Sequence, residues 1–261
     1  MSRAPGGDPQ LAATRHQVIL DTLRARGQVS ANGLADNLGV THETVRKDLL
    51  HLQERGLLRR VHGGAVPVES LTHEVPVGGR TAYGPEKARI AQAARHFLPD
   101  AGAVLLDSGT TTAAFADALP VSPRIVAFTN SLPIALTLLP RLGAVTMLGG
   151  RVRPETLATA DGWAMRAVEG VRADVAFLGA NALSPEHGLS TPDETEAEIK
   201  GAFVRAARLR VLLADHSKVG RESVHRYAAL ADIDILVTDT GLPLQDADAL
   251  TRDHGIEVVR A

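Results

Sequence analysis

The sequence predicts an α/β protein, with a small helical N-terminal domain and a larger C-terminal domain built on a mostly parallel sheet. Three observations predict it. Residues 11–55 carry apolar side chains at helical spacing, interrupted by glycines. From residue 85 onward, apolar runs of strand length alternate with helical stretches, which is typical of parallel strands joined by helices. Between these regions, residues 67–84 contain few periodic apolar residues but several Pro and Gly.

These patterns divide the 261 residues into four segments. We expect a disordered tail over residues 1–10, a first domain over 11–66, a linker over 67–84 and a second domain over 85–261. Apolar residues make up 44% of the chain and charged residues 22%, so the composition is that of an ordinary globular protein.

The composition excludes several kinds of site. The chain has no cysteine, which excludes disulfides, thiolate metal sites and cysteine nucleophiles and agrees with a cytoplasmic location. The ten histidines are scattered without the spacing of metal ligands, so we expect neither a metal nor another cofactor. No apolar run reaches the length of a membrane span, and the N-terminus lacks the pattern of a secretory signal.

Three helices are expected in the first domain, over residues 11–26, 31–38 and 41–55. Each is bounded by residues that start or stop helices, namely Gly27, Ser30, Gly39, Thr41 and Gly56. A basic extended segment, residues 57–62, then leads to a turn at Gly63–Gly64. Two helices joined by a glycine turn and followed by a basic hairpin predict a winged helix-turn-helix, whose second helix enters the major groove of DNA.

The third helix has one apolar side, formed by Val45, Leu49 and Leu52, and an opposite side that is polar and basic. Basic side chains there suit guanine or phosphate, and hydroxyls near the helix N-terminus suit phosphate. The candidate DNA-binding residues, including those of the hairpin, are Thr41, His42, Glu43, Thr44, Arg46, Lys47, Arg59, Arg60 and His62. Asp48 interrupts this basic surface, and we expect it to pair with a neighbouring Arg.

The alternative is a three-helix bundle whose charged residues are merely solvated. The distribution of charge favours a polyanionic partner for the first domain. Residues 1–66 hold nine Lys or Arg and six Asp or Glu, a net +3, whereas the remainder holds 19 and 24, a net −5.

This stretch resembles the helix-turn-helix of the DeoR family of bacterial regulators. The run Thr41-x-x-Thr44-Val45-Arg46-Lys47-Asp48-Leu49 is similar to the family's recognition-helix signature. Arg15, Ile19 and Leu23 match the start of its first helix, and the segments 56–58 and 60–65 resemble its wing. The resemblance implies operator DNA as a partner.

Seven apolar runs in the second domain are expected to form the strands of its sheet. They are residues 104–106, 125–128, 145–148, 175–178, 211–214, 235–237 and 256–259. The first run leads into Asp107-Ser108-Gly109-Thr110-Thr111-Thr112 and then an Ala-rich helix. Such a loop offers hydroxyls and backbone N–H groups to an anion, with the positive end of a helix behind it. The alternative is an ordinary helix cap, although three Thr and a Ser exceed what one cap requires.

Small and polar residues also follow several other strands, and a lysine follows one of them. Ligands of open α/β sheets bind at these carboxyl ends, so together the residues predict a site for a small polar anion. The candidate effector-binding residues are Asp107, Ser108, Gly109, Thr110, Thr111, Thr112, Thr129, Asn130, Gly149, Gly179 and Lys218. Glu196 and Lys200 stand one helical turn apart, where we expect an ion pair between them, with a role in the pocket as the second choice.

The second domain also resembles the DeoR family, whose sensor has a fold similar to ribose-5-phosphate isomerase. The matching pieces are Glu86-Lys87, the Asp107–Thr111 loop, Thr129-Asn130, Gly149-Gly150, Phe177–Ala180, Glu196-x-x-x-Lys200 and Asp215-x-Ser217-Lys218. The resemblance implies a phosphorylated sugar or polyol as effector.

Three functions are compatible with this sequence. The first is a transcriptional regulator, expected to be a repressor of carbohydrate genes that acts as a homo-oligomer and leaves its operator when the effector binds. The second is a sugar-phosphate isomerase that uses some of Asp107, Glu196, Asp215 and Lys218. The third is a constitutive DNA-binding protein whose large domain only oligomerises. We favour the first function and expect no catalytic residues. A helix-turn-helix has no purpose in an isomerase, and the Ser/Thr loop has no purpose in a constitutive DNA-binding protein.

Overall fold

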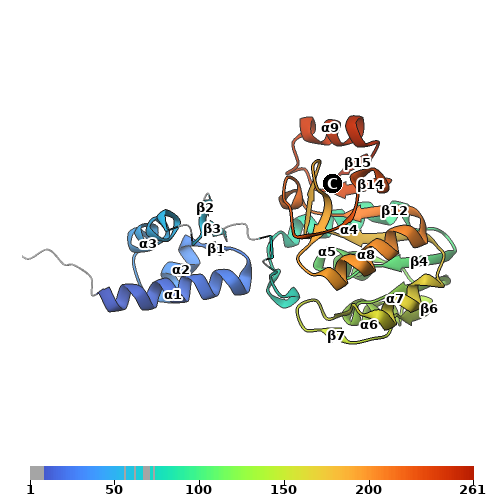
Figure 1. Ribbon diagram of the computed structural model, residues 1–261, viewed down its shortest axis with the longest axis horizontal. Helices are drawn as coiled ribbons and strands as arrows, with labels where there is room; N and C mark the ends of the chain where they lie inside the picture. Colours follow the sequence, from blue (N-terminus) through green and yellow to red (C-terminus); the bar gives the residue numbers. More distant parts are fainter. Residues whose placement is uncertain (1–8, 56, 62, 67–70, 73) are drawn as a thin grey trace, which may run out of the picture. The chain divides into compact units, whose positions relative to one another are not determined.

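The computed structural model describes residues 9–55, 57–61, 63–66, 71–72 and 74–261, and the chain divides into two compact units between Ala82 and Tyr83 (Figure 1). The expected tail lies outside the described residues except for Pro9 and Gln10, which belong to the first helix. Residues 67–70 and 73 of the expected linker also lie outside them. Within the described part of the chain, no helix is both long and apolar enough to cross a membrane.

The first unit contains three helices and a small antiparallel sheet. The elements are α1 (Pro9–Arg26), β1 (Val29–Ser30), α2 (Ala31–Leu38), α3 (His42–Glu54), β2 (Arg59–Val61) and β3 (Gly64–Val66). The sheet has the order β1-β3-β2, so the predicted hairpin gains a third strand that the sequence did not indicate. Gly64 makes this possible, because a Cβ there would collide with the carbonyl oxygen of Val29.

Local signals set the helix boundaries as the sequence indicated. The Ser30 hydroxyl accepts from Gly33 N at 3.0 Å, and Gly39 ends α2 in the left-handed conformation with φ 62°. Apolar faces of the three helices meet in one core, which includes Ile19, Leu34 and Leu49. The winged helix-turn-helix prediction therefore agrees with the structure.

The second unit is built on a seven-stranded sheet of order β15-β14-β12-β9-β4-β5-β6, in which all pairs are parallel. Its strands are β4 (Gly102–Leu106), β5 (Ser122–Thr129), β6 (Leu142–Met147), β9 (Ala173–Gly179), β12 (Ala207–Leu213), β14 (Ile235–Thr238) and β15 (Glu257–Arg260). All seven coincide with the predicted runs to within a few residues at their ends. This confirms the predicted α/β class.

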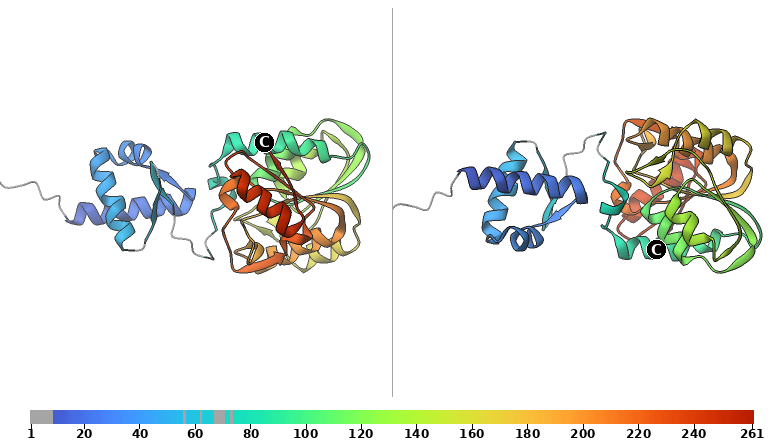
Figure 2. Two further views of the ribbon diagram at one scale, coloured as in Figure 1. Left: turned by 90° about the horizontal axis from the view of Figure 1, so that it is seen from above. Right: turned by 90° about the horizontal axis from the view of Figure 1, so that it is seen from below.

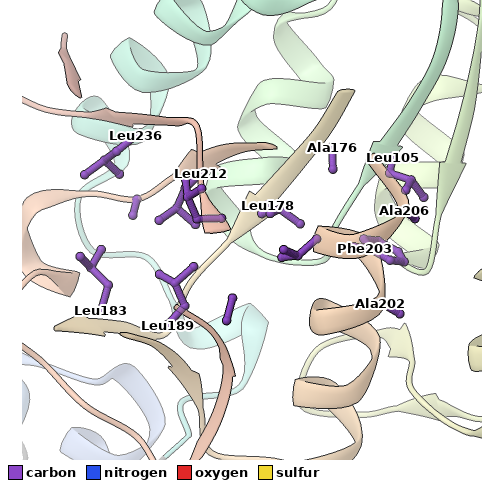
Figure 3. Packing of buried hydrophobic residues seen from close by; sticks show 14 of the residues in the cluster. Leu105, Ala176, Leu178, Leu183, Leu189, Ala202, Phe203, Ala206, Leu212 and Leu236 are labelled. Atoms are coloured by element: carbon purple, nitrogen blue, oxygen red, sulfur yellow. The ribbon is translucent and has the colours of Figure 1, made fainter. Parts of the chain in front are cut away.

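Six helices cover the two faces of this sheet. They are α4 (Gly84–Ala94), α5 (Thr110–Ala118), α6 (Leu132–Leu138), α7 (Gly162–Glu169), α8 (Glu194–Ala206) and α9 (Leu244–His254). Apolar residues of α4, α5 and α6 belong to one core, and those of α7, α8 and α9 to another. In Figure 2, the teal and green helices and the yellow to orange helices accordingly lie on opposite sides of the sheet. Figure 3 shows the second core, where Phe203 of α8 lies among Leu105, Leu178 and Ala206.

Short elements were not evident from the sequence. A hairpin of β7 (Val152–Arg153) and β8 (Ala158–Thr159) follows β6, and β10 (Ala182–Ser184), β11 (Gly188–Thr191) and β13 (His225–Ala228) form a separate antiparallel sheet. Single turns of 3₁₀-helix occur at Val77–Gly79, Arg95–Phe97, His216–Lys218 and Leu230–Asp232. Runs of two to four residues are too short to show a clear period.

The strand order creates a switch point beside β4. The chain continues from β4 outward to β5 and β6, and then returns to place β9 on the opposite side of β4. In open α/β sheets, ligands bind at the carboxyl ends of strands at such a point. Asp107 follows β4 there, and Gly179 ends β9.

Candidate functional site

The N-terminus of α3 is capped by a pair of threonines. Thr41 has extended backbone, and its hydroxyl accepts from Thr44 N at 3.2 Å and bonds to Thr44 Oγ1 at 2.9 Å. Both residues, and His42 and Lys47 as well, belong to the surface of the unit and not to its core. The helix therefore presents an accessible N-terminus, as reading of base edges requires.

Two of the candidate DNA-binding side chains pair with each other. Arg46 donates to Glu43 through Nε at 2.8 Å and through Nη2 at 3.0 Å, and both side chains are more than half exposed. The hydrogen bond from Arg46 holds the pKa of Glu43 below its ordinary value. An exposed pair of this kind is weak, so Arg46 can exchange Glu43 for a base or a phosphate.

Asp48 is buried, with 5% of its surface exposed. It accepts from Arg15 Nε at 2.5 Å and Arg15 Nη2 at 2.8 Å, and it bonds to His16 Nε2 at 2.8 Å. Burial acts to raise the pKa of Asp48, but these partners outweigh it, and the pKa lies below its ordinary value. Asp48 pairs with an Arg as expected, but the partner is Arg15 of α1 and not a neighbour in sequence, so the pair joins α3 to α1 across 33 positions.

The wing is tied to the end of α3. Arg60 N donates to Gln53 Oε1 at 2.8 Å, and Arg59 and Arg60 pair in register with Val66 and Ala65 on β3. Arg59 contributes only its backbone to the described part of the structure, and His62 lies outside it.

The turn from β4 to α5 forms the centre of the predicted effector site. Gly109 occupies the N-cap position with φ 141°, where a side chain would be strained, and no side chain caps α5 within the described part of the chain. The Thr112 hydroxyl is buried and donates to the Gly109 carbonyl at 3.0 Å, so it supports the turn. Ser108 and Thr111 are buried, and Thr110 is partly exposed. The first backbone N–H groups of α5 thus lack an acceptor inside the helix.

Beside this turn lies a buried ion pair between Asp107 and Lys200. The Lys200 ammonium donates to Asp107 Oδ2, which also accepts from Gly179 N at 3.0 Å. Both side chains are at most 4% exposed. Burial raises the pKa of Asp107, while the Lys200 ammonium and the Gly179 N–H oppose that shift. Asp107 Oδ1 has no hydrogen-bond partner among the described residues.

Tyr227 of β13 completes this buried cluster. Its hydroxyl donates to the Gly179 carbonyl at 3.0 Å, and the Lys200 ammonium lies 5.8 Å from the centre of its ring. Burial raises the pKa of Tyr227 well above its ordinary value. Tyr227 was not a sequence candidate, because nothing in the pattern of β13 distinguishes it from a core residue.

The expected ion pair between Glu196 and Lys200 is wrong. Lys200 turns to Asp107, while Glu196 Oε1 lies 2.7 Å from Arg153 Nη1. Arg153 Nη2 lies 3.2 Å from Asp193, the N-cap of α8, so one guanidinium joins the β7–β8 hairpin to the start of α8. Glu196 and Lys200 both lie on the buried side of α8, where a charge needs a close partner. Each of them finds that partner on a different element.

Thr129 and Asn130 at the end of β5 mainly support the backbone. The Thr129 hydroxyl accepts from Ser131 N at 3.1 Å, and Asn130 Nδ2 donates to the Thr159 carbonyl at 3.0 Å. Asn130 Oδ1 is buried without a described partner. Gly149 is exposed, and a Cβ there would meet nothing within 4 Å, so no close approach requires glycine.

The ends of β12 and β14 bring further polar groups to the same edge of the sheet. Asp215 caps the turn His216–Lys218, and Lys218 is partly exposed in that turn. His216 Nδ1 bonds to Asp239 Oδ2 at 2.8 Å, and its ring meets the ring of Tyr83 edge-on at 5.2 Å. Neither His216 nor Asp239 was a candidate from the sequence.

The carboxyl edge therefore combines an uncapped helix with buried acceptors. Oxygen atoms of Asp107, Asn130, Asp215 and Thr238 are buried there without a hydrogen-bond partner among the described residues. Such atoms are uncommon in folded proteins, so each calls for a partner that the described residues do not supply. The described residues contain no cluster of three His, Asp or Glu suited to a metal ion.

Two family models match the chain. Residues 15–71 match the DeoR-like helix-turn-helix domain, and residues 84–240 match the DeoR C terminal sensor domain.

Curated relatives match over nearly the whole length. The transcriptional regulator GlpR of Haloferax volcanii is 39% identical, over 92% of this chain and 93% of that one. The putative aga operon transcriptional repressor of Escherichia coli O157:H7 is 31% identical, over 97% and 96%. The glycerol-3-phosphate regulon repressor of Escherichia coli is 29% identical, over 94% and 97%.

A solved structure of ribose 5-phosphate isomerase A from Methanocaldococcus jannaschii is a distant match. It is 17% identical with a TM-score of 0.37, over 51% of this chain and 53% of that one. The match of both domain models, in the order of the two units, identifies the protein: the chain belongs to the DeoR family of transcriptional regulators.

Proposed function

We propose that this protein is a repressor that binds operator DNA through α3 and the wing and leaves it when a phosphorylated sugar or polyol binds the second unit. It acts in the cytoplasm as a homo-oligomer, because one winged helix reads a single half-site and a stable operator complex needs two. Residues 67–84 carry the coupling between the units. Relatives named as repressors of the aga operon and of the glycerol-3-phosphate regulon support repression, as opposed to activation, and the proposed class of ligand.

The observation that carries the proposal is the uncapped N-terminus of α5 beside the Asp107–Lys200 pair. A phosphate gains from the free N–H groups and the positive end of the helix. The carboxylate of Asp107 would repel that phosphate, but Lys200 neutralises it. The free Asp107 Oδ1 is then an acceptor for a ligand hydroxyl. Together these groups select a ligand that carries both a phosphate and hydroxyls.

A thermal-shift screen against sugar and polyol phosphates tests the ligand class. Glycerol 3-phosphate and several hexose phosphates are compared with the same compounds lacking phosphate. A ligand at 100 times its dissociation constant stabilises the protein by about 2.7 kcal/mol, a shift of a few degrees. The compound found is then added to a complex with DNA from upstream of the protein's own gene. Release of DNA supports the proposal; stabilisation by the free sugars alone contradicts it.

The substitution Thr110→Asp tests the position of the phosphate. The new carboxylate stands at the N-terminus of α5 and repels the phosphate, so we expect loss of the thermal shift with operator binding unchanged. Thr110→Asn, which has the same shape without the charge, is the matched control and should retain most of the response. An unaltered response in Thr110→Asp would place the anion elsewhere.

Two assays separate the remaining functions. An isomerase would interconvert ribose 5-phosphate and its ketose, with turnover lost in Lys218→Ala, and we expect no such turnover. A constitutive DNA-binding protein would hold its operator with the same affinity across the whole panel of phosphates, whereas we expect one compound to weaken binding.

A further inference from the structure

The two edge strands of the large sheet differ in charge. The edge strand β15 carries Glu257 and Arg260, and charges of this kind keep an edge from pairing with other strands. The other edge strand, β6, runs Leu-Gly-Ala-Val-Thr-Met without a charge. Its residues Ala144 and Thr146 are exposed, and its pairing with β5 is regular from Ala144 to Met147. An open, uncharged edge is unusual in a protein that remains in solution alone.

The helix that flanks this edge is apolar on its outer side as well. Leu132 and Leu136 of α6 and Leu139, its C-cap residue, are 43%, 62% and 58% exposed. Their spacing of four and three residues places them in one stripe. The opposite side of α6, with Ile134 and Leu138, is buried against the sheet. Since α6 packs against β6, the helix that carries this stripe is a direct neighbour of the open edge strand (Figure 1).

Charge is sparse on these two elements, although Arg124 of β5 and Arg151 stand just outside them. Residues 125–150, which include β6 and α6, contain a single charged side chain, Arg141. Its guanidinium donates to the Leu119 carbonyl at 2.8 Å, so it is committed within the unit. At the average charged fraction of the chain, 22%, a stretch of this length would carry several charges.

We propose that β6 and the α6 stripe form a two-fold interface with a second copy of this chain. An edge strand that runs antiparallel to its own copy supplies both the donors and the acceptors that each strand lacks. A two-fold axis perpendicular to the sheet keeps both α6 helices on the same face, where their leucine stripes pack together. The lack of charge means that two identical surfaces do not repel each other. The proposal relies on the proposed function only for the expectation that the protein is an oligomer.

Cysteine cross-linking locates the interface directly, because the native chain has no cysteine. We would introduce Ala144→Cys, Val145→Cys and Thr146→Cys separately, with Glu257→Cys on the β15 edge as the control, and treat each variant with a short bis-maleimide. Residues that face each other across an antiparallel pair share a face of the sheet, so an axis through this stretch places one of the three positions opposite itself. Gly143 is avoided, because a Cβ there would collide with the Pro123 carbonyl.

We expect at least one β6 variant to form a covalent dimer and Glu257→Cys to stay monomeric on a denaturing gel. If sedimentation shows that the chain is dimeric and no β6 variant cross-links, the interface lies elsewhere and the inference is overturned, while operator binding and effector response remain as tests of the function. A chain that sediments as a monomer at tens of micromolar also overturns it.

A second pair of variants tests the α6 stripe. Leu136→Lys places a charge at its centre, and Leu244→Lys places one at a similarly exposed leucine of α9, which is 65% exposed. Neither substitution alters a core residue. The monomer of each variant should therefore melt at the same temperature as the native monomer. We expect Leu136→Lys to raise the dimer dissociation constant about tenfold or more and Leu244→Lys to leave it unchanged. An equal effect of the two would contradict the proposal.

Discussion

The two candidate sites of this protein each contain an ion pair, but the two pairs differ in their exposure to water. On α3, Arg46 and Glu43 pair three residues apart, and both side chains are more than half exposed. At the carboxyl edge, Asp107 and Lys200 pair across 93 positions and are almost fully buried. Water weakens the first pair, so Arg46 can leave Glu43 for another partner. The second pair is shielded from water, so its two side chains are already held in place before any ligand binds. The difference predicts which substitutions affect folding and which affect binding.

The largest expected effect is on the buried pair. Lys200→Met leaves the Asp107 carboxylate buried without its counter-charge, and we expect a loss of about 3–5 kcal/mol in the free energy of unfolding. Urea unfolding followed by the fluorescence of Trp163, the single tryptophan, measures it. The double variant Asp107→Asn, Lys200→Met should recover much of the loss, because neither of these two positions then carries a buried charge. A single variant as stable as the native chain would show that the pair is unimportant for folding.

A smaller effect is expected at Asp48, which is buried but lies near the surface. Asp48→Ala removes the acceptor of Arg15 and His16, and we expect a loss of about 1–3 kcal/mol. Hydrogen exchange of the amides of α1 and α3 reports it separately from the second unit. Arg46→Ala, on the same helix but exposed, should leave this exchange unchanged.

The same carboxylate predicts a pH dependence of the first unit. The pKa of Asp48 is lower in the folded than in the unfolded chain, so its stabilisation is complete above the unfolded pKa of about 3.9. It is lost as the pH falls through the folded pKa. The protection factors of the α1 and α3 amides, which are exchange rates corrected for the intrinsic pH dependence of exchange, should therefore fall below about pH 4 in the native chain. The fall should be smaller in Asp48→Asn; an identical profile would assign it to other groups.

For DNA binding, Arg46→Ala should weaken operator affinity by about one to two orders of magnitude and relax specificity at one base position. Glu43→Gln tests the exposed pair from the other side, because it releases Arg46 and removes a negative charge from the DNA-facing surface. Affinity should then rise or stay constant, measured by fluorescence anisotropy at fixed salt. Unchanged affinity in Arg46→Ala would remove Arg46 from the readout.

The smallest effect concerns the cap of α3. Thr41→Ala removes the acceptor for Thr44 N and should cost about 1 kcal/mol of stability in the first unit, whereas Thr41→Ser should cost little. Hydrogen exchange at the first turn of α3 distinguishes the two variants. Equal exchange in the two variants would mean that the Thr41 hydroxyl does not stabilise the N-terminus of α3.

The sequence by itself determined the three helices of the first unit and the seven strands of the large sheet. Periodicity separated three helices from seven strands, because each apolar face must meet a core, and caps such as Ser30 and Thr41 marked helix starts because a local side chain satisfies a local N–H group. It also placed the Asp107–Thr112 loop at the start of α5, since strand, loop and helix are contiguous.

Only the tertiary structure decided which of these residues meet. The order of parallel strands depends on crossovers and not on local pattern, and it alone places Asp107 of the β4 end beside Gly179 of the β9 end. The spacing of two charges on a helix fits a local pair as well as two distant pairs, so the sequence predicts a Glu196–Lys200 pair, whereas in the fold their partners are Arg153 and Asp107. The open edge at β6 follows from the same cause: a strand becomes an edge only when the sheet has been assembled.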